Sequence, residues 1–295
     1  MTTRRSFLQQ AGMLSAGVFL APSLFGCKTG NTTTDKEVGI QLYTLREQIS
    51  KDVNGVIGKV AEAGYKNVET YGYSTESKFW GLDPKAFKQL MDSNGLKSAS
   101  GHYDFNGYFR DGNDDVIKSY IEAGSAIGQT YITAPYIIEP LRPDADAYKG
   151  IAEKLNRAAE LCKSANMQLA YHNHDFEFQS HGGTTGYEIL LSETDADLVK
   201  MELDLYWVVR AGLKPQDLFQ QNPGRYVMWH VKDMDKASPN LNTEVGAGSI
   251  NYKEIFEHAK QSGVQYYFVE QENFAMDPYA SIQQSINYVK SDLMK

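Results

Sequence analysis

The chain has 295 residues, of which 42% are hydrophobic and 22% are charged. This balance is typical of a protein with a large buried core and excludes intrinsic disorder as its main state. Asp and Glu outnumber Lys and Arg by 37 to 29, which gives a formal net charge of -8. The chain therefore lacks the positive field that a phosphate backbone attracts, and nucleic acid is not an expected partner.

The N-terminal segment has the pattern of an export signal. Arg4 and Arg5 precede a bulky apolar pair, and residues 11–26 carry no charge, which is typical of a twin-arginine signal. This uncharged run is shorter than the about 20 residues that a membrane-spanning helix needs. We therefore interpret residues 1–26 as a removable signal peptide and the polar residues 27–36 as a tether.

Cys27 directly follows the uncharged run, and residues 24–27 resemble a lipoprotein signal box, in which the cysteine becomes the lipidated first residue of the mature chain. We expect a periplasmic protein that reaches the membrane only through a lipid on Cys27. The alternative is a plain cleaved signal with an incidental cysteine. Cys162 lies in a helical pattern and is expected to be a small buried apolar residue, without a disulfide partner if Cys27 is lipidated.

From residue 37 onward one unit recurs. An amphipathic stretch ends at a Gly or Asn that can adopt a left-handed conformation, and a short apolar run that ends in a polar residue follows. The apolar runs predict strands at 38–43, 67–69, 96–102, 131–133, 169–172, 198–204, 226–230 and 266–270. About eight β/α units in about 260 residues predict an α/β fold, a single-domain (β/α)8 TIM barrel spanning 37–295.

The alternative architecture with this rhythm is an open doubly wound sheet. Such a sheet usually carries a Gly-x-Gly-x-x-Gly loop after its first strand. Here residues 41–46 read Gln-Leu-Tyr-Thr-Leu-Arg instead, so the sequence favours the barrel.

Ionisable side chains stand at the ends of the predicted strands. In a parallel barrel these ends meet at one mouth, and residues two apart on a strand point the same way. The strand-end residues are Gln41, Glu69, His102, His172 with His174, Glu202 with Asp204, His230 with Lys232, and Glu270 with Glu272.

This set of side chains indicates a metal site. Several carboxylates gathered in a partly desolvated mouth repel one another and lose hydration, and a divalent cation resolves that conflict. Each residue alone is explained better as a solvated strand end or a paired core histidine, but six or more strand ends agree. Two imidazoles with two carboxylates suit Mn²⁺, Zn²⁺, Co²⁺ or Fe²⁺ better than Ca²⁺, and we expect Mn²⁺.

Four segments resemble the xylose-isomerase-like superfamily of sugar isomerases and epimerases, and the resemblance extends over residues 38–290. They are Leu-Asp-Leu-Tyr-Trp at 203–207, His-Val-Lys-Asp at 230–233, Val-Gly-Ala-Gly-Ser-Ile at 245–250 and Phe-Val-Glu at 268–270. The resemblance implies that His172, Asp204, His230 and Glu270 hold the metal. It also leads us to expect a homodimer formed through the barrel loops.

One position departs from the epimerase pattern. Epimerases of this kind usually carry Glu at the end of the fifth strand, as a ligand and as one of two opposed bases, whereas residues 171–174 here read Tyr-His-Asn-His. That form is similar to the inosose dehydratase branch, which eliminates water beside a ketone. By this comparison His172 rather than His174 is the ligand. Glu270 is then the carboxylate base, and Glu177 or His174 supplies the second proton-transfer group.

The expected function is that of a metal-dependent sugar isomerase or epimerase. A chelated sugar ketone has an acidic neighbouring C–H, and a carboxylate can remove that proton to give an enediolate. Expulsion of a group β to the carbonyl would instead make the enzyme a lyase that releases water or an aglycone. Lys232 is expected to hold an enediolate oxygen or, alternatively, to form a salt bridge.

Other residues are expected to bind the substrate. Glu69 and His102 are explained about equally well as surface strand ends. Phe79, Trp80 and residues 105–109 would form either an apolar wall for a sugar ring or a packed lid. Residues 246–248 (Gly-Ala-Gly) are interpreted as a tight loop capped by Ser249, or as backbone that touches sugar hydroxyls. The expected substrate-binding residues are Gln41, Glu69, His102, His174 and Trp207.

An exported enzyme rarely meets sugar phosphates, so the expected substrate is a neutral sugar or a keto-glycoside. Two other functions fit the same fold. One is a carbohydrate-binding lipoprotein without catalysis. The other is AP-endonuclease-like phosphodiester cleavage, which conflicts with the net charge of -8 and the export signal.

Overall fold

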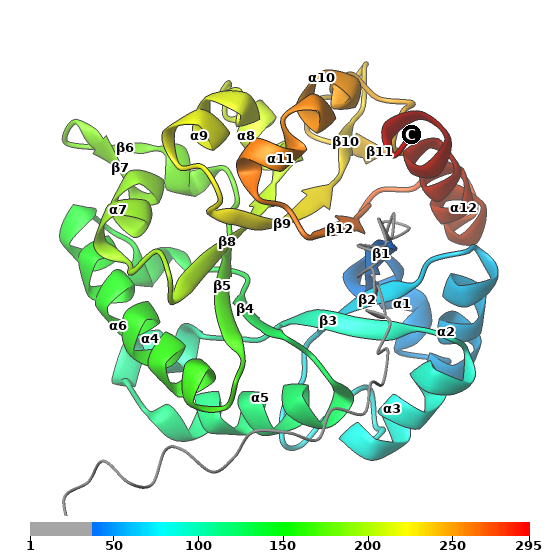
Figure 1. Cartoon of the computed structure of the whole chain (residues 1–295), viewed down its shortest axis with the longest axis horizontal. Coiled ribbons are helices and arrows are strands. Elements are labelled where there is room, and N and C mark those ends of the chain that lie inside the picture. Colours follow the sequence, from blue (N-terminus) through cyan, green and yellow to red (C-terminus); the bar gives the residue numbers. More distant parts are fainter. Residues whose placement is uncertain (1–36) are drawn as a thin grey trace, which may run out of the picture. The chain divides into compact units, whose positions relative to one another are not determined.

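Eight parallel strands close into a barrel in the computed structural model, which describes residues 37–295 (Figure 1). Successive barrel strands are neighbours, and the last pairs with the first. The strands are β1 (Val38–Gln41), β2 (Asn67–Tyr71), β3 (Lys97–His102), β4 (Tyr131–Ala134), β5 (Gln168–His172), β8 (Val199–Asp204), β9 (Tyr226–Val231) and β12 (Tyr266–Val269). The predicted (β/α)8 TIM barrel is confirmed. The expected signal at 1–26, the tether at 27–36 and Cys27 lie outside the described residues.

Every barrel strand overlaps the apolar run that predicts it, and the observed ends differ from the predicted ones by at most two residues. Two short antiparallel hairpins were not predicted. One pairs β6 (Ser180–His181) with β7 (Thr184–Thr185), and the other pairs β10 (Asp233–Met234) with β11 (Asn242–Thr243). They lie in the loops that follow β5 and β9, where two-residue strands leave little periodicity in the sequence.

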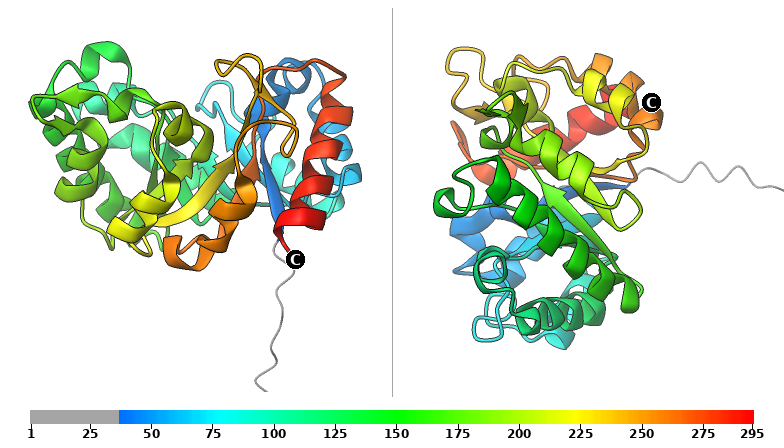
Figure 2. Two further views of the ribbon diagram at one scale, coloured as in Figure 1. Left: turned by 90° about the horizontal axis from the view of Figure 1, so that it is seen from above. Right: turned by 90° about the vertical axis from the view of Figure 1, so that its left-hand side faces the viewer.

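Helices surround the strands (Figures 1 and 2). They are α1 (Arg46–Ile49), α2 (Val53–Glu62), α3 (Pro84–Ser93), α4 (Asn106–Asp111), α5 (Asp114–Ile127), α6 (Ala145–Ser164), α7 (Gly186–Glu193), α8 (Leu205–Arg210), α9 (Pro215–Gln221), α10 (Tyr252–Glu257), α11 (Ala259–Ser262) and α12 (Pro278–Tyr288). Short 3-10 turns cover Leu42–Leu45, Glu139–Leu141 and Phe176–Phe178, and a π-helical turn covers Val289–Leu293. Within residues 37–295, no helix is both long enough and apolar enough to span a bilayer.

Helix α6 illustrates how the sequence forms these outer elements. The Asp144 side chain accepts a hydrogen bond from the Ala147 N–H and caps the first turn, and Asn166 with φ of 58° ends the helix. Its buried residues recur every three or four positions, so one face packs on the barrel. Cys162 belongs to that face and is fully buried, as predicted. Burial raises the pKa of its thiol to about 12, which leaves it unreactive.

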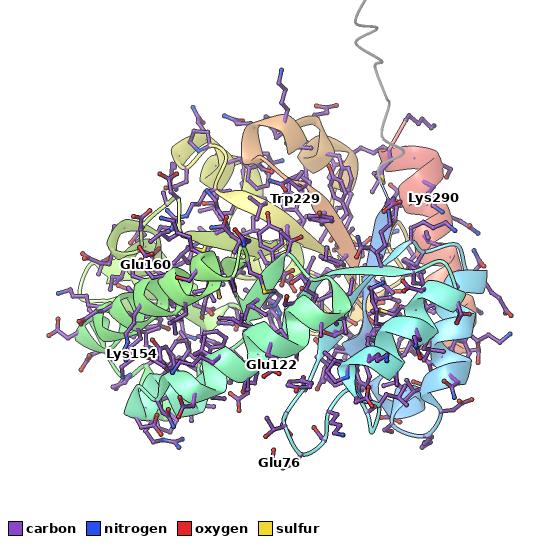
Figure 3. All side chains as sticks on the ribbon, turned by 60° about the horizontal axis from the view of Figure 1, so that its bottom comes forward. Glu76, Glu122, Lys154, Glu160, Trp229 and Lys290 are labelled. Atoms are coloured by element: carbon purple, nitrogen blue, oxygen red, sulfur yellow. The ribbon has the colours of Figure 1, made fainter. Side chains whose placement is uncertain are left out.

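The C-terminal helix α12 lies beside the first β/α unit and covers the junction where the barrel closes (Figures 1 and 2). The buried Tyr65 hydroxyl donates to the Ile282 carbonyl at 2.8 Å and ties this helix to the start of β2. Polar side chains such as Glu122 on α5 and Glu160 on α6 extend outwards, whereas Trp229 on β9 is buried and stacks on Phe219 of α9 (Figure 3).

Apolar side chains fill the barrel below the strand ends. Ala170, Met228 and Phe268 are buried and belong to one interior cluster. They stand two residues before His172, His230 and Glu270, so they point to the same side of their strands. The ionisable side chains therefore rest on a packed apolar floor rather than on a water-filled channel.

The loop at 242–250 is built around the buried Asp233 carboxylate. Its two oxygens accept hydrogen bonds from the backbone N–H groups of Gly246, Gly248, Ile250 and Met234 at 2.8–3.1 Å. The interpretation that this Gly-Ala-Gly backbone touches sugar hydroxyls is therefore wrong, because Asp233 occupies its glycine N–H groups. The tight-loop interpretation is confirmed, but the cap is Asn251 rather than Ser249.

The aromatic residues of two loops pack inwards. Phe79, Phe105, Tyr108 and Phe109 are at most 3% exposed and belong to the main hydrophobic core. Trp80 is half-buried and packs edge-on against Phe87. These aromatic side chains are packed into the core and do not line the pocket described below, so the alternative of an apolar wall for a sugar ring is wrong for them.

Candidate active site

Ionisable side chains gather at the carboxyl ends of the barrel strands. His102, His172, Asp204 and His230 lie at the ends of β3, β5, β8 and β9, and Glu270 directly follows β12. All except His102, which is partly exposed, are buried. Alternation along each strand turns these side chains into the barrel, where they form two layers that we call the outer group and the inner group.

The outer group consists of Asp204, Glu270 and one ring nitrogen each of His172 and His230. The Asp204 Oδ2 atom lies 3.9 Å from His172 Nε2 and 4.0 Å from His230 Nδ1. Glu270 Oε2 lies 3.0 Å from His230 Nδ1. Separations of about 3 to 4 Å are those of neighbouring ligand atoms around a cation with bonds of about 2.1 Å. Of the four residues expected to hold a metal, the structure thus brings Asp204, His230 and Glu270 within 4.8 Å of one another. His172 approaches this set through its contact with Asp204.

Among residues 37–295, one carboxylate oxygen of Asp204 accepts a hydrogen bond, and the other does not. Its Oδ1 atom accepts the Trp207 N–H at 3.0 Å and caps α8, and its backbone N–H donates to Asn173 Oδ1 at 3.0 Å. Its Oδ2 atom is buried and has no hydrogen-bond partner among the described residues. An unpaired buried carboxylate oxygen is costly, and a cation at the outer group would remove that cost.

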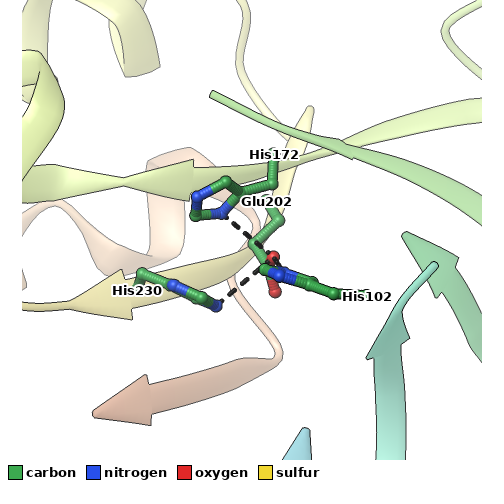
Figure 4. A group of neighbouring side chains, drawn as sticks. All are labelled: His102, His172, Glu202 and His230. Carbon is green, nitrogen blue, oxygen red and sulfur yellow. Dashed lines mark hydrogen bonds and ion pairs between the residues drawn. The ribbon is translucent and has the colours of Figure 1, made fainter. Parts of the chain in front are cut away.

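The inner group lies on the other side of the two imidazoles. It consists of Glu69, Glu202, His102 and the second ring nitrogens of His172 and His230. Figure 4 shows His102, His172 and His230 around Glu202. The His102 Nε2 to Glu202 Oε2 distance is 2.6 Å, and the His172 Nδ1 to Glu202 Oε2 distance is 3.2 Å. Glu69 Oε2 lies 2.6 Å from His230 Nε2 and accepts a hydrogen bond from Gln41 at 2.8 Å.

The two groups carry an excess of negative charge. Burial alone would lower the pKa of His230, but Glu202, Glu270 and Glu69 raise it well above its usual range. Burial and the neighbouring His230 lower the pKa of His172 to about 3, so that ring stays neutral and can donate a lone pair to a metal. The cluster thus requires positive charge, and its nitrogen and oxygen donors are able to hold a divalent metal ion.

Lys232 stands beside this cluster. Its ammonium forms an ion pair with Glu272 and lies 3.5 Å from Glu270 Oε2. Burial opposes its charge, but Glu270, Asp204 and Glu272 raise its pKa above the usual range. The Tyr252 hydroxyl accepts from the Lys232 N–H and donates to the Lys232 carbonyl, which fixes the backbone at this position. The salt-bridge interpretation of Lys232 is confirmed, and the residue also lines the pocket described next.

A pocket of about 430 Å³ opens above the outer group. It is lined by Tyr43, Tyr71, Gly72, His102, Asp104, Asn106, Pro135, Tyr136, His172, His174, Trp207, Lys232, Glu270 and Glu272. Three of the expected substrate-binding residues, His102, His174 and Trp207, are among these.

Gln41 and Glu69 do not line the pocket. Both side chains are fully buried, and they bond to each other below the imidazole of His230. The expectation that they contact the substrate does not fit this placement. The pocket residues of these two units stand two positions further along the chain: Tyr71 is the last residue of β2, and Tyr43 follows the end of β1.

Glu177 is also outside the pocket. It is fully buried, accepts a hydrogen bond from the Tyr171 hydroxyl at 2.6 Å and accepts the His174 N–H at 2.8 Å. Burial raises the pKa of its carboxyl to about 7. The catalytic role expected for Glu177 does not fit this position, because the carboxylate faces the loop it stabilises and not the cavity.

Several pocket residues were missed in the sequence. Three of them stand two residues beyond the predicted strand-end residues Gln41, Glu69 and His102, and the alternation that pairs His172 with His174 could have found these three. The fourth follows β4, for which the sequence offered no ionisable strand end. Two of the pocket-lining aromatic side chains are partly exposed, Tyr43 by 39% and Tyr136 by 38%. The missed residues of this kind are Tyr43, Tyr71, Asp104 and Tyr136.

The profile of a protein family described as "Xylose isomerase-like TIM barrel" matches residues 57–291. A relative named inosose dehydratase, from Lacticaseibacillus casei, is 24% identical over 245 residues, which cover 70% of this chain and 77% of the relative.

Solved structures agree with this match. A sugar phosphate isomerase/epimerase from Parabacteroides distasonis superposes with a TM-score of 0.77 and 26% identity, covering 90% of this chain and 97% of that one. A probable 3-DHS dehydratase from Bacillus anthracis superposes with a TM-score of 0.69 and 13% identity, covering 87% of this chain and 99% of that one. The second likeness concerns the fold alone.

Proposed function

The chain belongs to the xylose isomerase-like TIM barrel family, and on this premise we propose that it is a divalent-metal-dependent sugar isomerase or epimerase. The reaction begins with removal of the proton beside a sugar carbonyl. The observation that carries the proposal is the outer group, in which two imidazole nitrogens face two carboxylates at the floor of a pocket of about 430 Å³.

The metal would be held by His172, Asp204, His230 and Glu270. Bound there, a divalent cation polarises the carbonyl and the adjacent hydroxyl of a ketose and makes the neighbouring C–H acidic. The mixed nitrogen and oxygen donors suit Mn²⁺, with Zn²⁺, Co²⁺ and Fe²⁺ as alternatives.

Glu270 is the proposed base. Burial disfavours its ionised form, but Lys232 and His230 outweigh burial and hold its pKa well below the usual range. It therefore enters the reaction as a carboxylate that can accept a proton. Lys232, which stays charged 3.5 Å from that carboxylate, is placed to donate a hydrogen bond to an enediolate oxygen.

His174 is the proposed second proton-transfer group, in place of Glu177. It lines the pocket, and its ring stacks on Phe176 with an interplanar angle of 9°. Phe176 is covered on its ring by the Arg142 guanidinium at 3.7 Å. This stack holds the imidazole in one orientation, which proton transfer at a defined carbon requires.

The charges of the pocket favour an uncharged sugar. Among the described residues, Lys232 is the one Lys or Arg that lines the pocket, and it already forms an ion pair with Glu272. Asp104, Glu270 and Glu272 add negative charge. A phosphate group needs several N–H or guanidinium donors, which this lining does not offer. Aromatic rings such as Tyr136 and Trp207 suit the apolar faces of a sugar or a keto-glycoside.

Elimination is the second candidate. Epimerases of this kind usually carry a glutamate at the end of the fifth strand as their second base, whereas β5 here ends in His172 and the proposed second group is a histidine, His174. A dehydratase needs one base and a leaving group, and a relative of this chain is named inosose dehydratase. A lyase that releases water or an aglycone from a keto-sugar is therefore the alternative outcome of the same first step.

We also propose export by the twin-arginine route and lipid attachment at Cys27, on the pattern of residues 1–27. A Cys27→Ala variant would then appear in the soluble periplasmic fraction, whereas equal membrane association of variant and wild type would exclude lipidation.

Proton NMR in D₂O tests the proposed function with a panel of ketoses and 3-keto-glycosides, each with Mn²⁺ and with a chelator. We expect deuterium to enter beside the carbonyl only with metal, and the exchange to be lost in Glu270→Gln but kept in Glu160→Gln on the outer face of α6 (Figure 3). Retention of the carbon skeleton and its substituents would indicate isomerisation or epimerisation, and loss of water or aglycone would indicate a lyase. Absence of exchange with every sugar and metal would contradict the proposal and favour a binding protein.

A further inference from the structure

His172 and His230 each belong to both groups, because each ring offers its two nitrogens to different layers. His172 presents Nε2 to Asp204 at 3.9 Å and Nδ1 to Glu202 at 3.2 Å. His230 presents the opposite pair, with Nδ1 toward Asp204 and Glu270 and with Nε2 toward Glu69 at 2.6 Å and, at the longer distance of 3.3 Å, toward Glu202. The two imidazoles thus form a partition between the outer and the inner carboxylates.

The chemistry of imidazole decides which layer can hold a cation. A neutral imidazole has one nitrogen with a lone pair and one that carries hydrogen. A ring that binds a metal through the first nitrogen needs a hydrogen-bond acceptor at the second. The same two rings therefore cannot ligate one cation in the outer group and another in the inner group while both remain neutral.

We propose that Glu202 and Glu69 are positioning residues that accept the N–H groups of His172 and His230 and so hold the two rings toward a single cation in the outer group. This inference rests on the metal site of the proposed function. It predicts opposite tautomers, since His172 carries its hydrogen on Nδ1 and His230 carries its hydrogen on Nε2. It also predicts one metal ion per chain.

The surroundings of the two glutamates support this assignment. Both side chains are fully buried. Gln41 donates to Glu69 at 2.8 Å, and His102 bonds to Glu202 at 2.6 Å. Glu69 is thereby fixed from the neighbouring strand β1, and Glu202 on β8 is fixed from β3, which is not its neighbour in the barrel. Contacts of this kind are how an outer shell orients metal ligands.

The contact between Glu202 and His172 differs in geometry from the contact between Glu69 and His230. His230 Nε2 and Glu69 form a hydrogen bond, whereas His172 Nδ1 lies within range of Glu202 without the alignment of one. A small rotation of the His172 ring about its χ2 bond would align the N–H with Glu202. We therefore expect the orientation of His172 to depend on the cation more than that of His230 does.

The assignment also explains a group of residues at the barrel mouth that are ionisable or polar but buried away from the pocket. Gln41, Glu69 and Glu202 lie below the imidazoles and outside the pocket lining. We therefore infer that they orient the imidazole rings of His172 and His230. Substitutions of these residues should weaken metal binding more than substrate binding.

The first test measures the wild-type full-length protein and uses two variants only to assign its signals. Nitrogen-15 NMR of the histidine rings with bound Zn²⁺ distinguishes the two tautomers. We expect one ligand histidine protonated at Nδ1 and the other at Nε2, assigned with His172→Gln and His230→Gln. Identical tautomers in the two rings would overturn the proposal.

The second test is a calorimetric titration with Mn²⁺. We expect one ion per chain, no measurable binding in Asp204→Asn, and affinity about 10–100-fold weaker in Glu202→Gln and Glu69→Gln. Glu160→Gln serves as the matched surface control and should bind as wild type does. The visible absorption spectrum of bound Co²⁺ should change in Glu202→Gln but not in Glu160→Gln.

Three outcomes of the titration would overturn the proposal. Two ions per wild-type chain would mean that the inner group also binds metal. Complete loss of binding in Glu202→Gln with retention in Asp204→Asn would place the cation in the inner group. Affinity within twofold of wild type in both glutamate variants would remove the positioning role. A protein that binds metal as expected but exchanges no sugar proton would contradict the proposed function alone.

Discussion

Two buried aspartates at neighbouring strand ends show how the same side chain takes two functions in this barrel. Asp204 ends β8 and Asp233 begins β10 just after β9, and both are 0% exposed. Asp233 accepts four backbone N–H groups, two on each oxygen. Asp204 accepts one such bond on Oδ1 and, in the described part of the chain, no hydrogen bond on Oδ2.

The difference arises from the loops. Gly248 lets the backbone approach Asp233 closely, because a Cβ there would lie 2.2 Å from Asp233 Oδ1. Gly246 has φ of 90°, and a Cβ there would meet the Tyr288 ring at 2.5 Å. Residues 205–207 instead enter α8 at once and supply one N–H to Asp204. A buried carboxylate that is surrounded by N–H groups stabilises the fold, whereas one with a bare oxygen is available to a cation.

The largest effect on stability is expected at the satisfied aspartate. Asp233→Asn replaces an acceptor by a donor among four backbone N–H groups, so we expect the free energy of unfolding to fall by about 2–4 kcal/mol. Urea unfolding followed by circular dichroism measures it, with Asp217→Asn on the exposed face of α9 as the control. A loss no larger than that of the control would break the contrast with Asp204.

Glu177 sharpens the comparison as an intermediate case, with two donors and a pKa raised by burial to about 7. The Glu177 carboxyl binds its proton more tightly in the folded state than in the unfolded chain, where its pKa has the ordinary value of about 4.3. The protonated carboxyl therefore contributes its full stabilisation below about pH 4.3, and this stabilisation is lost as the pH rises through 7. Glu177→Gln cannot ionise. Its unfolding free energy relative to wild type should rise by about 2–3 kcal/mol between pH 5 and pH 8.

Chelator is present throughout this Glu177 comparison, so the metal ligands contribute equally to both proteins. Urea unfolding at the two pH values measures the difference. A difference between variant and wild type that is the same at pH 5 and pH 8 would show that the Glu177 carboxyl has an ordinary pKa.

The smallest effect is expected at the unsatisfied aspartate and has the opposite sign. Burial raises the pKa of Asp204 to about 7, so at pH 8 without metal its ionised form costs stability. Asn keeps the helix cap and removes the charge. We expect Asp204→Asn to be more stable than wild type by about 1 kcal/mol in chelator and to lose the stabilisation by Mn²⁺ that wild type shows in thermal unfolding. Destabilisation in chelator would mean that Asp204 supports the fold as Asp233 does.

The strands and the strand-end residues were predictable because two local patterns carry them. Apolar runs between helix stops locate each strand, and the alternation of side chains along it identifies which residues reach the mouth, as for His172 and His230. Alternation identifies the strand-end residues, and the family resemblance implies the metal set of His172, Asp204, His230 and Glu270 among them. The structure brings atoms of this set within 3.0–4.0 Å of their neighbours.

The depth of each residue was not predictable in the same way. Gln41 and Glu69 were expected at the substrate and lie below the imidazoles, and Glu177 was expected as a catalytic group and is buried under its own loop. A residue's height in a barrel depends on the stagger between paired strands, which is set by contacts with distant strands rather than by neighbours in the sequence.

The sequence by itself determined the barrel, the identity of the ionisable strand ends and the inertness of Cys162, because burial and periodicity leave a mark in the order of residue types. The tertiary structure decided which strand-end side chains face the pocket, which face one another and which oxygen of Asp204 is left bare. These properties depend on distances of a few tenths of a nanometre between residues from different strands, and hydrogen bonding at that range is decided only when the whole barrel closes.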